Sequence, residues 1–254
     1  MLLAIDSGNT NTVFGLFDGD TLLGQWRMVT NAHRTADEYA VWLGEMLGLD
    51  NRTLKEINGV VIATVVPQVI FNLRQLCERY CCCKPIIVTN EIELGLRVLV
   101  DRPAEVGADR LVNAVAAYKT YKTALIVIDF GTATTFDCIN MDGDYIGGVI
   151  APGIDLSLEA LHQAAAKLPL IAIERPESVL GTTTVGAMQS GIYWGYISLI
   201  EGIVARIRSE RDEVMSTVGT GGHAQLFARS TSVIEHLDSE LTLRGLQQIF
   251  QRNV

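Results

Sequence analysis

The sequence of 254 residues lacks the common phosphate-binding signatures. It contains no Gly-x-x-x-x-Gly-Lys-Ser/Thr loop, no Gly-x-Gly-x-x-Gly fingerprint and no protein-kinase motif set. These absences argue against a P-loop NTPase, a dinucleotide-binding Rossmann domain and a protein kinase. Any phosphate chemistry in this chain must use another arrangement of glycines and hydroxyl side chains.

The chain is also poor in positive charge. It has 20 Lys and Arg against 29 Asp and Glu, with a net charge of −9 and a pI near 4.9. This balance argues against a general nucleic-acid or acidic-membrane surface, although it leaves room for a local basic pocket. No basic segment or cleavage site follows Met1, so we expect no signal peptide and a cytoplasmic protein.

A long membrane-spanning run is absent as well. The longest candidate, residues 178–200, is uncharged but holds four glycines, three threonines and three serines. We expect a loop and a core-packed helix there, not a membrane span. The five cysteines, three of them consecutive at 81–83, form no paired Cys-x-x-Cys set and have no adjacent histidine cluster. We therefore expect reduced thiols at a helix end instead of a zinc site.

What is present indicates a folded protein with a substantial core. Hydrophobic residues make up 48% of the chain and charged residues 19%. The length suits two domains of about 110 to 140 residues, or a single large one. A repeat favours two, and we predict an N-terminal half at 1–120 and a C-terminal half at 121–254.

The repeat consists of an apolar strand, an acid, a glycine-and-hydroxyl turn and a second strand. Residues 3–15 read Leu-Ala-Ile-Asp-Ser-Gly-Asn-Thr-Asn-Thr-Val-Phe-Gly, and residues 126–138 read Ile-Val-Ile-Asp-Phe-Gly-Thr-Ala-Thr-Thr-Phe-Asp-Cys. Asp129 stands 123 positions after Asp6 (129 − 6), and a glycine and a threonine follow at the same offset. An Asp-Gly-Asp turn follows each copy, at 18–20 and 142–144. This order predicts two homologous halves.

Two interpretations of the turn are open. It is an ordinary hairpin with polar turn residues, or its backbone N–H groups converge on an anion such as phosphate. In the second case the hydroxyls of Thr10 and Thr12 add donors, and Asp6 holds a metal ion or its waters. The second copy of the turn favours the second interpretation.

The rest of the first half predicts a mixed sheet flanked by helices. We expect a third strand at 22–30, a capping box from Thr35 to Glu38 at a helix start, a buried strand at 59–63, a helix beginning at Pro67 and a strand at 85–88. A glycine loop then precedes Asp109 and Arg110 at the start of another helix. Asp109 either complements the helix dipole, or serves as a proton acceptor beside a guanidinium that binds a carboxylate.

The second half adds three glycine-rich segments. One, at 147–153, leads into a helix where we expect His162 to be partly buried. In the helix that follows the segment at 181–184, Gly186, Gly191 and Gly195 allow another backbone to approach, either within the chain or across a dimer. The third segment, at 219–222, follows a strand predicted at 214–218, and a nucleotide base and ribose have room there against bare backbone.

The combination of two acid–glycine–threonine turns with a late Gly-Thr-Gly-Gly resembles the actin, sugar kinase and Hsp70 ATPase superfamily. Within it, the chain resembles the type III pantothenate kinases over nearly its whole length. The blocks that carry the resemblance are Asp6-Ser7-Gly8-Asn9-Thr10, Gly107-Ala108-Asp109-Arg110, Asp129-Phe130-Gly131-Thr132-Ala133-Thr134-Thr135, Pro152-Gly153, Lys167-Leu168-Pro169, Gln189-Ser190-Gly191 and Thr220-Gly221-Gly222.

The resemblance implies an α/β fold: a duplicated actin-like (ribonuclease H-like) ATPase with two mixed-sheet domains and an interdomain cleft for ATP. It implies a cytosolic homodimer that transfers the γ-phosphate of ATP to the primary hydroxyl of pantothenate, giving 4'-phosphopantothenate in the first step of coenzyme A biosynthesis. No nucleic acid or membrane partner is expected.

The resemblance also implies roles for individual residues. Asp109 is the proton acceptor, and Asp129 binds a monovalent cation, K⁺ or NH4⁺, while a divalent metal such as Mg²⁺ accompanies ATP. The residues implied for ATP are Asp6, Ser7, Gly8, Asn9, Thr10, Asn11, Thr12, Val13 and Thr132. Those implied for pantothenate are Gly107, Ala108, Asp109, Arg110 and Thr184.

The chain departs from the family pattern at three positions. Val100 stands where a tyrosine of the pantothenate pocket is usual, Thr183 where asparagine is common, and Ala165 where threonine is common. Two rival functions are open, a phosphohydrolase of the same superfamily and a transcription accessory protein without chemistry. The intact Asp6, Asp109 and Asp129 argue against the accessory protein, whereas pantothenate-dependent ADP release would distinguish a kinase from a phosphohydrolase.

Overall fold

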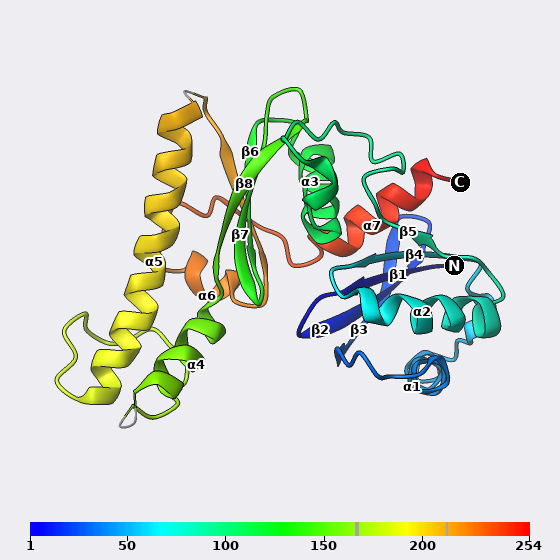
Figure 1. Cartoon of the computed structure of the whole chain (residues 1–254), viewed down its shortest axis with the longest axis horizontal. Coiled ribbons are helices and arrows are strands. Elements are labelled where there is room, and N and C mark those ends of the chain that lie inside the picture. The colour runs from blue at the N-terminus through cyan, green and yellow to red at the C-terminus, as the bar shows by residue number, and fades with distance from the viewer. Residues whose placement is uncertain (166–167, 212) are drawn as a thin grey trace. The chain divides into compact units, whose positions relative to one another are not determined.

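The computed structural model describes residues 1–165, 168–211 and 213–254 (Figure 1). Their contacts divide the chain into two compact units. Unit 1 contains Met1–Lys119 and Glu240–Val254, and unit 2 contains Thr120–Ser239. The predicted division into halves at residue 120 remains a prediction. Unit 1 contains residues 240–254, which the prediction gave to the second half. Lys167 of the predicted Lys-Leu-Pro block lies outside the described residues.

Unit 1 is built on a five-stranded mixed sheet. Its strands are β1 (Leu2–Ser7), β2 (Asn11–Asp18), β3 (Thr21–Val29), β4 (Gly59–Thr64) and β5 (Ile86–Ile87). Their order is β3-β2-β1-β4-β5. The first three form an antiparallel meander, and β4, the strand predicted to be buried, pairs with β1 in parallel. The predicted mixed sheet is therefore confirmed.

Two helices cover one face of this sheet. They are α1 (Ala36–Gly48) and α2 (Pro67–Leu76), and their apolar side chains share a core with alternate residues of β1, β2 and β4 (Figure 1). The predicted capping box is confirmed, because the Thr35 hydroxyl accepts from the Glu38 amide and the Glu38 carboxylate accepts from the Thr35 amide at 2.7 Å. Short helical turns lie at Leu54–Glu56, Cys77–Cys81 and Pro103–Glu105.

Helix α7 (Leu241–Arg252) packs against β1 and β4, with Leu243 lying against Gly15. Its side-chain contacts also reach α3 (Ala108–Tyr121), because the Thr242 hydroxyl donates to Asn113 Oδ1 at 2.7 Å. A methyl group at Gly245 would lie 2.2 Å from the carbonyl oxygen of Val112, so α7 and α3 approach backbone to backbone. The last residues of the chain therefore complete the core of unit 1.

Unit 2 repeats the plan of unit 1. Its strands are β6 (Leu125–Phe130), β7 (Ala133–Ile139), β8 (Tyr145–Pro152), β9 (Ser216–Gly221) and β10 (His236–Leu237), in the order β10-β9-β6-β7-β8. Its helices are α4 (Ile154–Ala164), α5 (Thr184–Arg211) and α6 (Ala224–Ala228), which share a core with one face of the sheet (Figure 1). The strand predicted at 214–218 lies later, so most of the predicted glycine loop belongs to β9.

The hydrogen-bonding register confirms the duplication and corrects its alignment. Ser7 pairs with Thr12 across the first turn, whereas Phe130 pairs with Thr134 across the second. The second turn is thus one residue shorter, and Thr134, not Thr135, corresponds to Thr12. A constant offset concealed this deletion, because threonine occurs at both positions.

Two smaller expectations can be compared with the structure. All five cysteines are free thiols, and three of them follow α2 as predicted, with Cys82 in a left-handed conformation (φ 56°) after the short turn. The described residues include no helix with the length and apolar character that crossing a membrane requires.

The contact between α7 and α3 generates a stability prediction. Replacing Gly245 by Ala forces the two backbones apart, and we expect it to lower the free energy of unfolding by about 1–3 kcal/mol. The matched control is Gly44→Ala in α1, where an added methyl group meets only Leu54 at 3.8 Å. Since alanine favours helix, this control should be neutral or stabilising by up to about 1 kcal/mol. Chemical denaturation of both variants checks the prediction, and equal effects would contradict it.

Candidate active site

The turn between β1 and β2 is held by a chain of hydroxyl groups. Ser7 Oγ lies 2.8 Å from Thr12 Oγ1, which lies 2.9 Å from the hydroxyl oxygen of Thr30. Thr30 donates its proton to the carbonyl oxygen of Gly8 at 2.8 Å, so the chain runs in one direction from Ser7 to Gly8. The Thr12 side chain is fully buried. Its hydroxyl therefore does not face solvent as a phosphate donor, contrary to the sequence-based expectation.

The other residues of this turn are more accessible. Asn9 and Thr10 are exposed at its tip, and the Gly8 amide donates to the carbonyl oxygen of Asn11 at 3.0 Å. Asp6 pairs with Val13, and its side chain lies on the face of the sheet opposite the α1–α2 core, because residues alternate along a strand. Residues 6–13, which were predicted to bind ATP, thus form the turn together with the ends of β1 and β2.

The segment after β4 connects this turn to Asp109. The Thr64 hydroxyl and the Val65 amide both donate to the carbonyl oxygen of Ser7, at 2.9 and 3.3 Å. A methyl group at Gly107 would lie 3.5 Å from Val65 Cγ1 and 2.6 Å from Asp109 Oδ1. Within unit 1, the loop before α3 therefore lies beside the end of β1.

Asp109 occupies the first turn of α3, as predicted. Its Oδ1 accepts from the amide of Arg110 at 2.8 Å. Burial raises the pKa of the Asp109 carboxyl, and the hydrogen bond and charge of Arg110 only partly oppose this. An acid with a raised pKa at a glycine loop has the properties of a proton acceptor.

The turn between β6 and β7 in unit 2 is packed against glycines. Asp129 is half-buried near the end of β6, and a methyl group at Gly221 would lie 2.5 Å from Asp129 Oδ1. The Gly153 amide donates to the carbonyl oxygen of Thr132 at 3.0 Å, and a methyl group there would lie 2.3 Å from the same oxygen. Side chains at these two positions would displace the turn. Thr132 itself is exposed.

Hydroxyl groups support this second turn too. Thr134 is buried and hydrogen-bonded to the Tyr196 hydroxyl of α5, which donates to the carbonyl oxygen of Pro152 at 3.1 Å. Thr135, which pairs with Asp129, donates to the fully buried carboxylate of Asp137 at 3.0 Å. Sequence reasoning gave no role to Asp137, because a lone acid inside an apolar strand has no motif around it.

Comparison with known proteins shows the family of the chain. A family model for type III pantothenate kinase matches residues 2–206. A protein named type III pantothenate kinase from Paramagnetospirillum magneticum is 60% identical over 254 residues, covering 100% of this chain and 98% of its own. One from Rhodospirillum rubrum is 56% identical over 254 residues, covering 100% and 99%.

The chain belongs to the type III pantothenate kinase family.

Membership in the type III pantothenate kinases makes the chain an enzyme, an ATP-dependent kinase. Solved structures agree on the fold. An activator of 2-hydroxyisocaproyl-CoA dehydratase from Clostridium difficile, with bound ADPNP, has a TM-score of 0.57 at 12% identity over 99% of this chain and 93% of its own. A Campylobacter jejuni protein assigned to the Baf family of transcriptional activators has a TM-score of 0.59 at 19% identity over 99% and 98%. The predicted duplicated actin-like fold is confirmed.

The carboxylates near these turns can be compared with common metal sites. The described residues contain no group of three or more His, Cys, Asp or Glu side chains that would form a metal cage. Mg²⁺ is usually held by one or two carboxylates together with substrate phosphates. Asp6, near the end of β1, is a carboxylate of the kind that this mode uses.

The predicted pantothenate-binding Thr184 begins helix α5 and is exposed. The preceding Thr183 caps the helix, because its hydroxyl accepts from the Gly186 amide at 3.0 Å. Asparagine, which the resemblance led us to expect here, is also an N-cap residue, so Thr183 keeps the cap. Val100 is half-buried in the loop before α3, and nothing in the structure explains the loss of the usual tyrosine.

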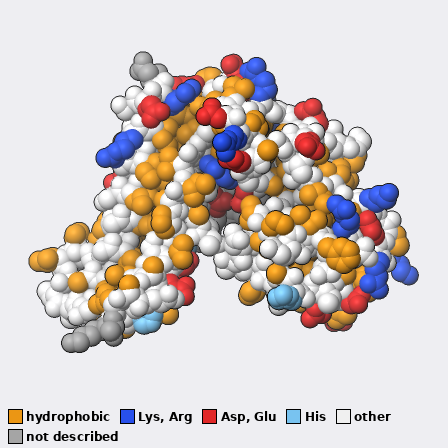
Figure 2. All heavy atoms as spheres, viewed as in Figure 1, with side chains coloured by type: hydrophobic (Ala, Val, Ile, Leu, Met, Phe, Trp, Pro, Cys, Tyr) orange, Lys and Arg blue, Asp and Glu red, His pale blue; other side chains and the backbone are white. Residues whose placement is uncertain are grey.

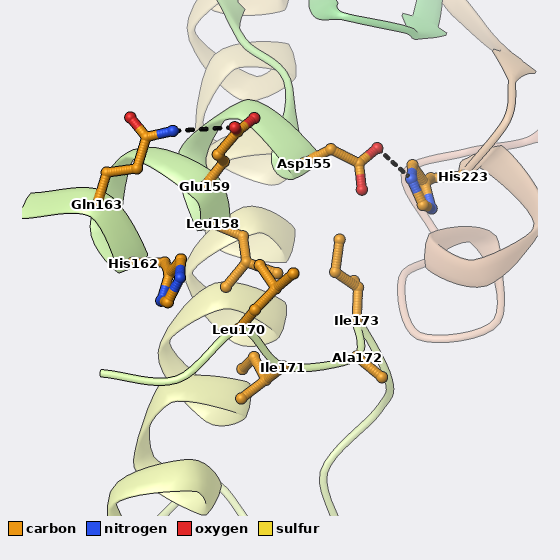
Figure 3. Close-up of a pocket in the computed structure, with 10 residues that line it drawn as sticks. All are labelled: Asp155, Leu158, Glu159, His162, Gln163, Leu170, Ile171, Ala172, Ile173 and His223. Carbon is orange, nitrogen blue, oxygen red and sulfur yellow. Dashed lines mark hydrogen bonds and ion pairs between the residues drawn. The ribbon is translucent and has the colours of Figure 1, made fainter. Parts of the chain in front are cut away.

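Sequence reasoning missed a cavity in unit 2 (Figure 3). It has a volume of about 490 Å³. His223 Nε2 lies 2.8 Å from Asp155 Oδ2 at one end of it. His162 at the other end is exposed, not partly buried as predicted, and its Nδ1 lies 2.6 Å from the carbonyl oxygen of Leu168. The cavity is lined by α4, by the segment at 170–173 and by His223. These parts are far apart in the sequence and come together only in the folded chain.

The raised pKa of Asp109 generates a prediction about stability. A carboxyl whose folded-state pKa lies above its unfolded-state value destabilises the fold once it ionises, so stability is lost as the pH rises through the folded-state pKa. We expect Asp109→Asn to unfold at higher denaturant concentration than the wild type at pH 7. The difference should shrink as the pH falls toward the ordinary Asp pKa of about 3.9. Asp101→Asn, at an exposed acid, is the control, and a less stable Asp109→Asn at pH 7 would contradict the prediction.

Proposed function

We propose that the chain is a pantothenate kinase that transfers the γ-phosphate of ATP to the primary hydroxyl of pantothenate, with Asp109 as the proton acceptor. The family supports this reaction because the relatives are named for it. The single observation that carries the residue assignment lies in unit 1. There, Val65 connects the Ser7 end of the β1–β2 turn with the Gly107 loop that presents Asp109.

The chemistry asks mainly for positioning. In phosphoryl transfer the protein does little covalent work, and catalysis comes from holding the reactants in line and neutralising charge. The pantothenate hydroxyl gives its proton to an Asp109 carboxylate oxygen while the alcohol oxygen bonds to the γ-phosphorus. The bond between that phosphorus and the β,γ-bridging oxygen breaks, and ADP leaves. A raised pKa suits Asp109 to this role, because a general base works best with a pKa near the working pH.

The other residues bind ATP, pantothenate and the cations. The turn at residues 6–13 and Thr132 bind the phosphates of ATP, chiefly through backbone N–H groups where the hydroxyls are buried. Gly107, Ala108, Arg110 and Thr184 bind pantothenate, whose carboxylate suits the two parallel N–H donors of the Arg110 guanidinium. Asp129 binds a monovalent cation, K⁺ or NH4⁺, and Mg²⁺ accompanies ATP. These cations supply positive charge that offsets the phosphates.

We further propose that the protein acts in the cytoplasm as a homodimer. Unit 2 exposes large apolar side chains around α4 and the start of α5, visible in the lower left of Figure 2. They are Leu156, Leu161, Leu170, Val179, Leu180 and Val185. In addition, a methyl group at Gly191 or Gly195 meets nothing within 4 Å among the described residues, so neither glycine serves a contact inside the chain. A second copy would explain both features.

A coupled assay of ADP release tests the reaction. We expect turnover to depend on pantothenate and on potassium. Asp109→Asn should lower kcat by about 10²- to 10⁴-fold, the usual contribution of a positioned base, while the KM for ATP changes little. Equal ADP release with and without pantothenate would point to a phosphohydrolase instead. No release under any condition would favour an accessory protein without chemistry.

The proposed homodimer is tested separately, by measuring the molar mass of the protein in solution with light scattering. Leu180 is 82% exposed and therefore contributes little to the fold of one chain. We expect Leu180→Glu to shift the protein from dimer to monomer without lowering its unfolding temperature. The control is Leu49→Glu, at a similarly exposed leucine that follows α1. A monomeric wild type, or a Leu180→Glu variant that stays dimeric, would contradict the proposal.

A further inference from the structure

We infer that Thr30 is a positioning residue for nucleotide binding. It orients the backbone carbonyl and N–H groups of the β1–β2 turn. This inference rests on the proposed function, because it assumes that the turn binds the phosphates of ATP. Thr30 lies outside the turn, directly after β3, and carries no motif that marks it.

Thr30 holds two carbonyl groups of the turn at once. Its hydroxyl donates to the carbonyl oxygen of Gly8 at 2.8 Å, and its amide donates to the carbonyl oxygen of Thr10 at 2.9 Å. The hydroxyl also accepts from Thr12 at 2.9 Å, which fixes its rotamer. One residue thus binds both sides of the exposed tip formed by Asn9 and Thr10.

The direction of these carbonyl groups decides what the turn offers a ligand. A carbonyl oxygen carries partial negative charge and repels phosphate, whereas converging N–H groups attract it. No cis peptide bond occurs among the residues that the structure describes, and in a planar trans peptide the C=O and the next N–H point in opposite directions. With the Gly8 and Thr10 carbonyls turned toward Thr30, the amides of Asn9 and Asn11 point away from it. The N–H side of the turn is then the side presented to an anion.

The second copy of the turn supports the inference independently. The register places Gly153 where Thr30 stands, because Asn11 pairs with Val29 and Ala133 pairs with Pro152. The Gly153 amide donates to the Thr132 carbonyl oxygen at 3.0 Å, matching the bond from Thr30 to Thr10. A methyl group at Gly153 would lie 2.3 and 2.5 Å from the carbonyl oxygens of Thr132 and Gly131. In both turns, two carbonyl groups therefore point toward the residue that follows the third strand of the unit, β3 or β8. The turn of unit 1 uses a side-chain hydrogen bond from Thr30, and the turn of unit 2 uses close packing against Gly153.

The test compares Thr30→Val with Thr30→Ser in the full-length protein. Valine keeps the shape of threonine and removes the donor, whereas serine keeps the donor. We measure the Kd for a non-hydrolysable ATP analogue with Mg²⁺ by calorimetry, and the KM values for ATP and pantothenate. Thr30→Val should raise the Kd and the KM for ATP about tenfold, equivalent to about 1.4 kcal/mol, and leave the KM for pantothenate within about twofold. Thr30→Ser should restore nucleotide binding to within about twofold of the wild type.

The controls separate this role from a general loss of structure. Thr53→Val removes an exposed hydroxyl that donates to Glu56 Oε1 at 3.2 Å, and it should leave every constant unchanged. If Thr30→Val does not fold, Thr30→Ala removes the same hydroxyl with less bulk. Wild-type affinity in a folded Thr30→Val, or equal increases in both KM values, would overturn the inference alone. A wild-type protein that binds no ATP analogue would overturn the proposed function and this inference with it.

Discussion

The architecture of unit 1 depends on the hydrogen bonds at the carboxyl end of β1. The Ser7 carbonyl oxygen accepts from the Thr64 hydroxyl and from the Val65 amide, so the end of β1 is fixed to the segment that follows β4. A buried carbonyl left without a donor would cost about 1–3 kcal/mol, which makes this contact sensitive to any shift of register. The same contact positions Val65 against the Gly107 loop. The turn, β4 and the start of α3 are therefore fixed relative to one another by one carbonyl group.

The duplication shows that one geometry is achieved with different residues. Each unit places a turn after its first strand, and each turn has a buried threonine whose hydroxyl bonds to a residue outside it, Thr12 to Thr30 and Thr134 to Tyr196. In unit 1 the Thr30 hydroxyl holds the turn by donating to the Gly8 carbonyl oxygen. In unit 2, Gly153 lies close to the Thr132 carbonyl oxygen and Gly221 lies close to the Asp129 carboxylate, because neither glycine has a side chain. Because the supporting residues differ, a repeat is visible in the sequence only where the turn itself demands particular residues. This explains why the sequence repeat covers a short stretch while the structural repeat covers two whole sheets.

Several sequence blocks together indicated the family by resemblance. The residues themselves were sufficient to predict the mixed sheet of unit 1, the capping box at Thr35 and the helix at Asp109. These features depend on local periodicity, capping and turn chemistry, which neighbouring residues determine. The sequence was insufficient for the assignment of α7 to unit 1 and for the burial of Thr12. The first depends on packing between residues more than a hundred positions apart, such as Gly245 and Val112. The second depends on a hydrogen bond from outside the turn, and the same threonine with an exposed hydroxyl would have looked identical in sequence.

The environment of Asp109 connects stability with the proposed chemistry. Burial disfavours the ionised carboxylate, which is the form that accepts a proton, so the group that suits catalysis also weakens the fold at neutral pH. The amide of Arg110 limits this cost by donating to Oδ1, and Gly107 allows the carboxylate to lie against the loop because it has no side chain. A larger residue at 107 would push the carboxylate toward solvent, where its pKa would fall and its orientation would loosen. The absence of a side chain at Gly107 therefore helps to keep the Asp109 carboxyl buried and its pKa raised.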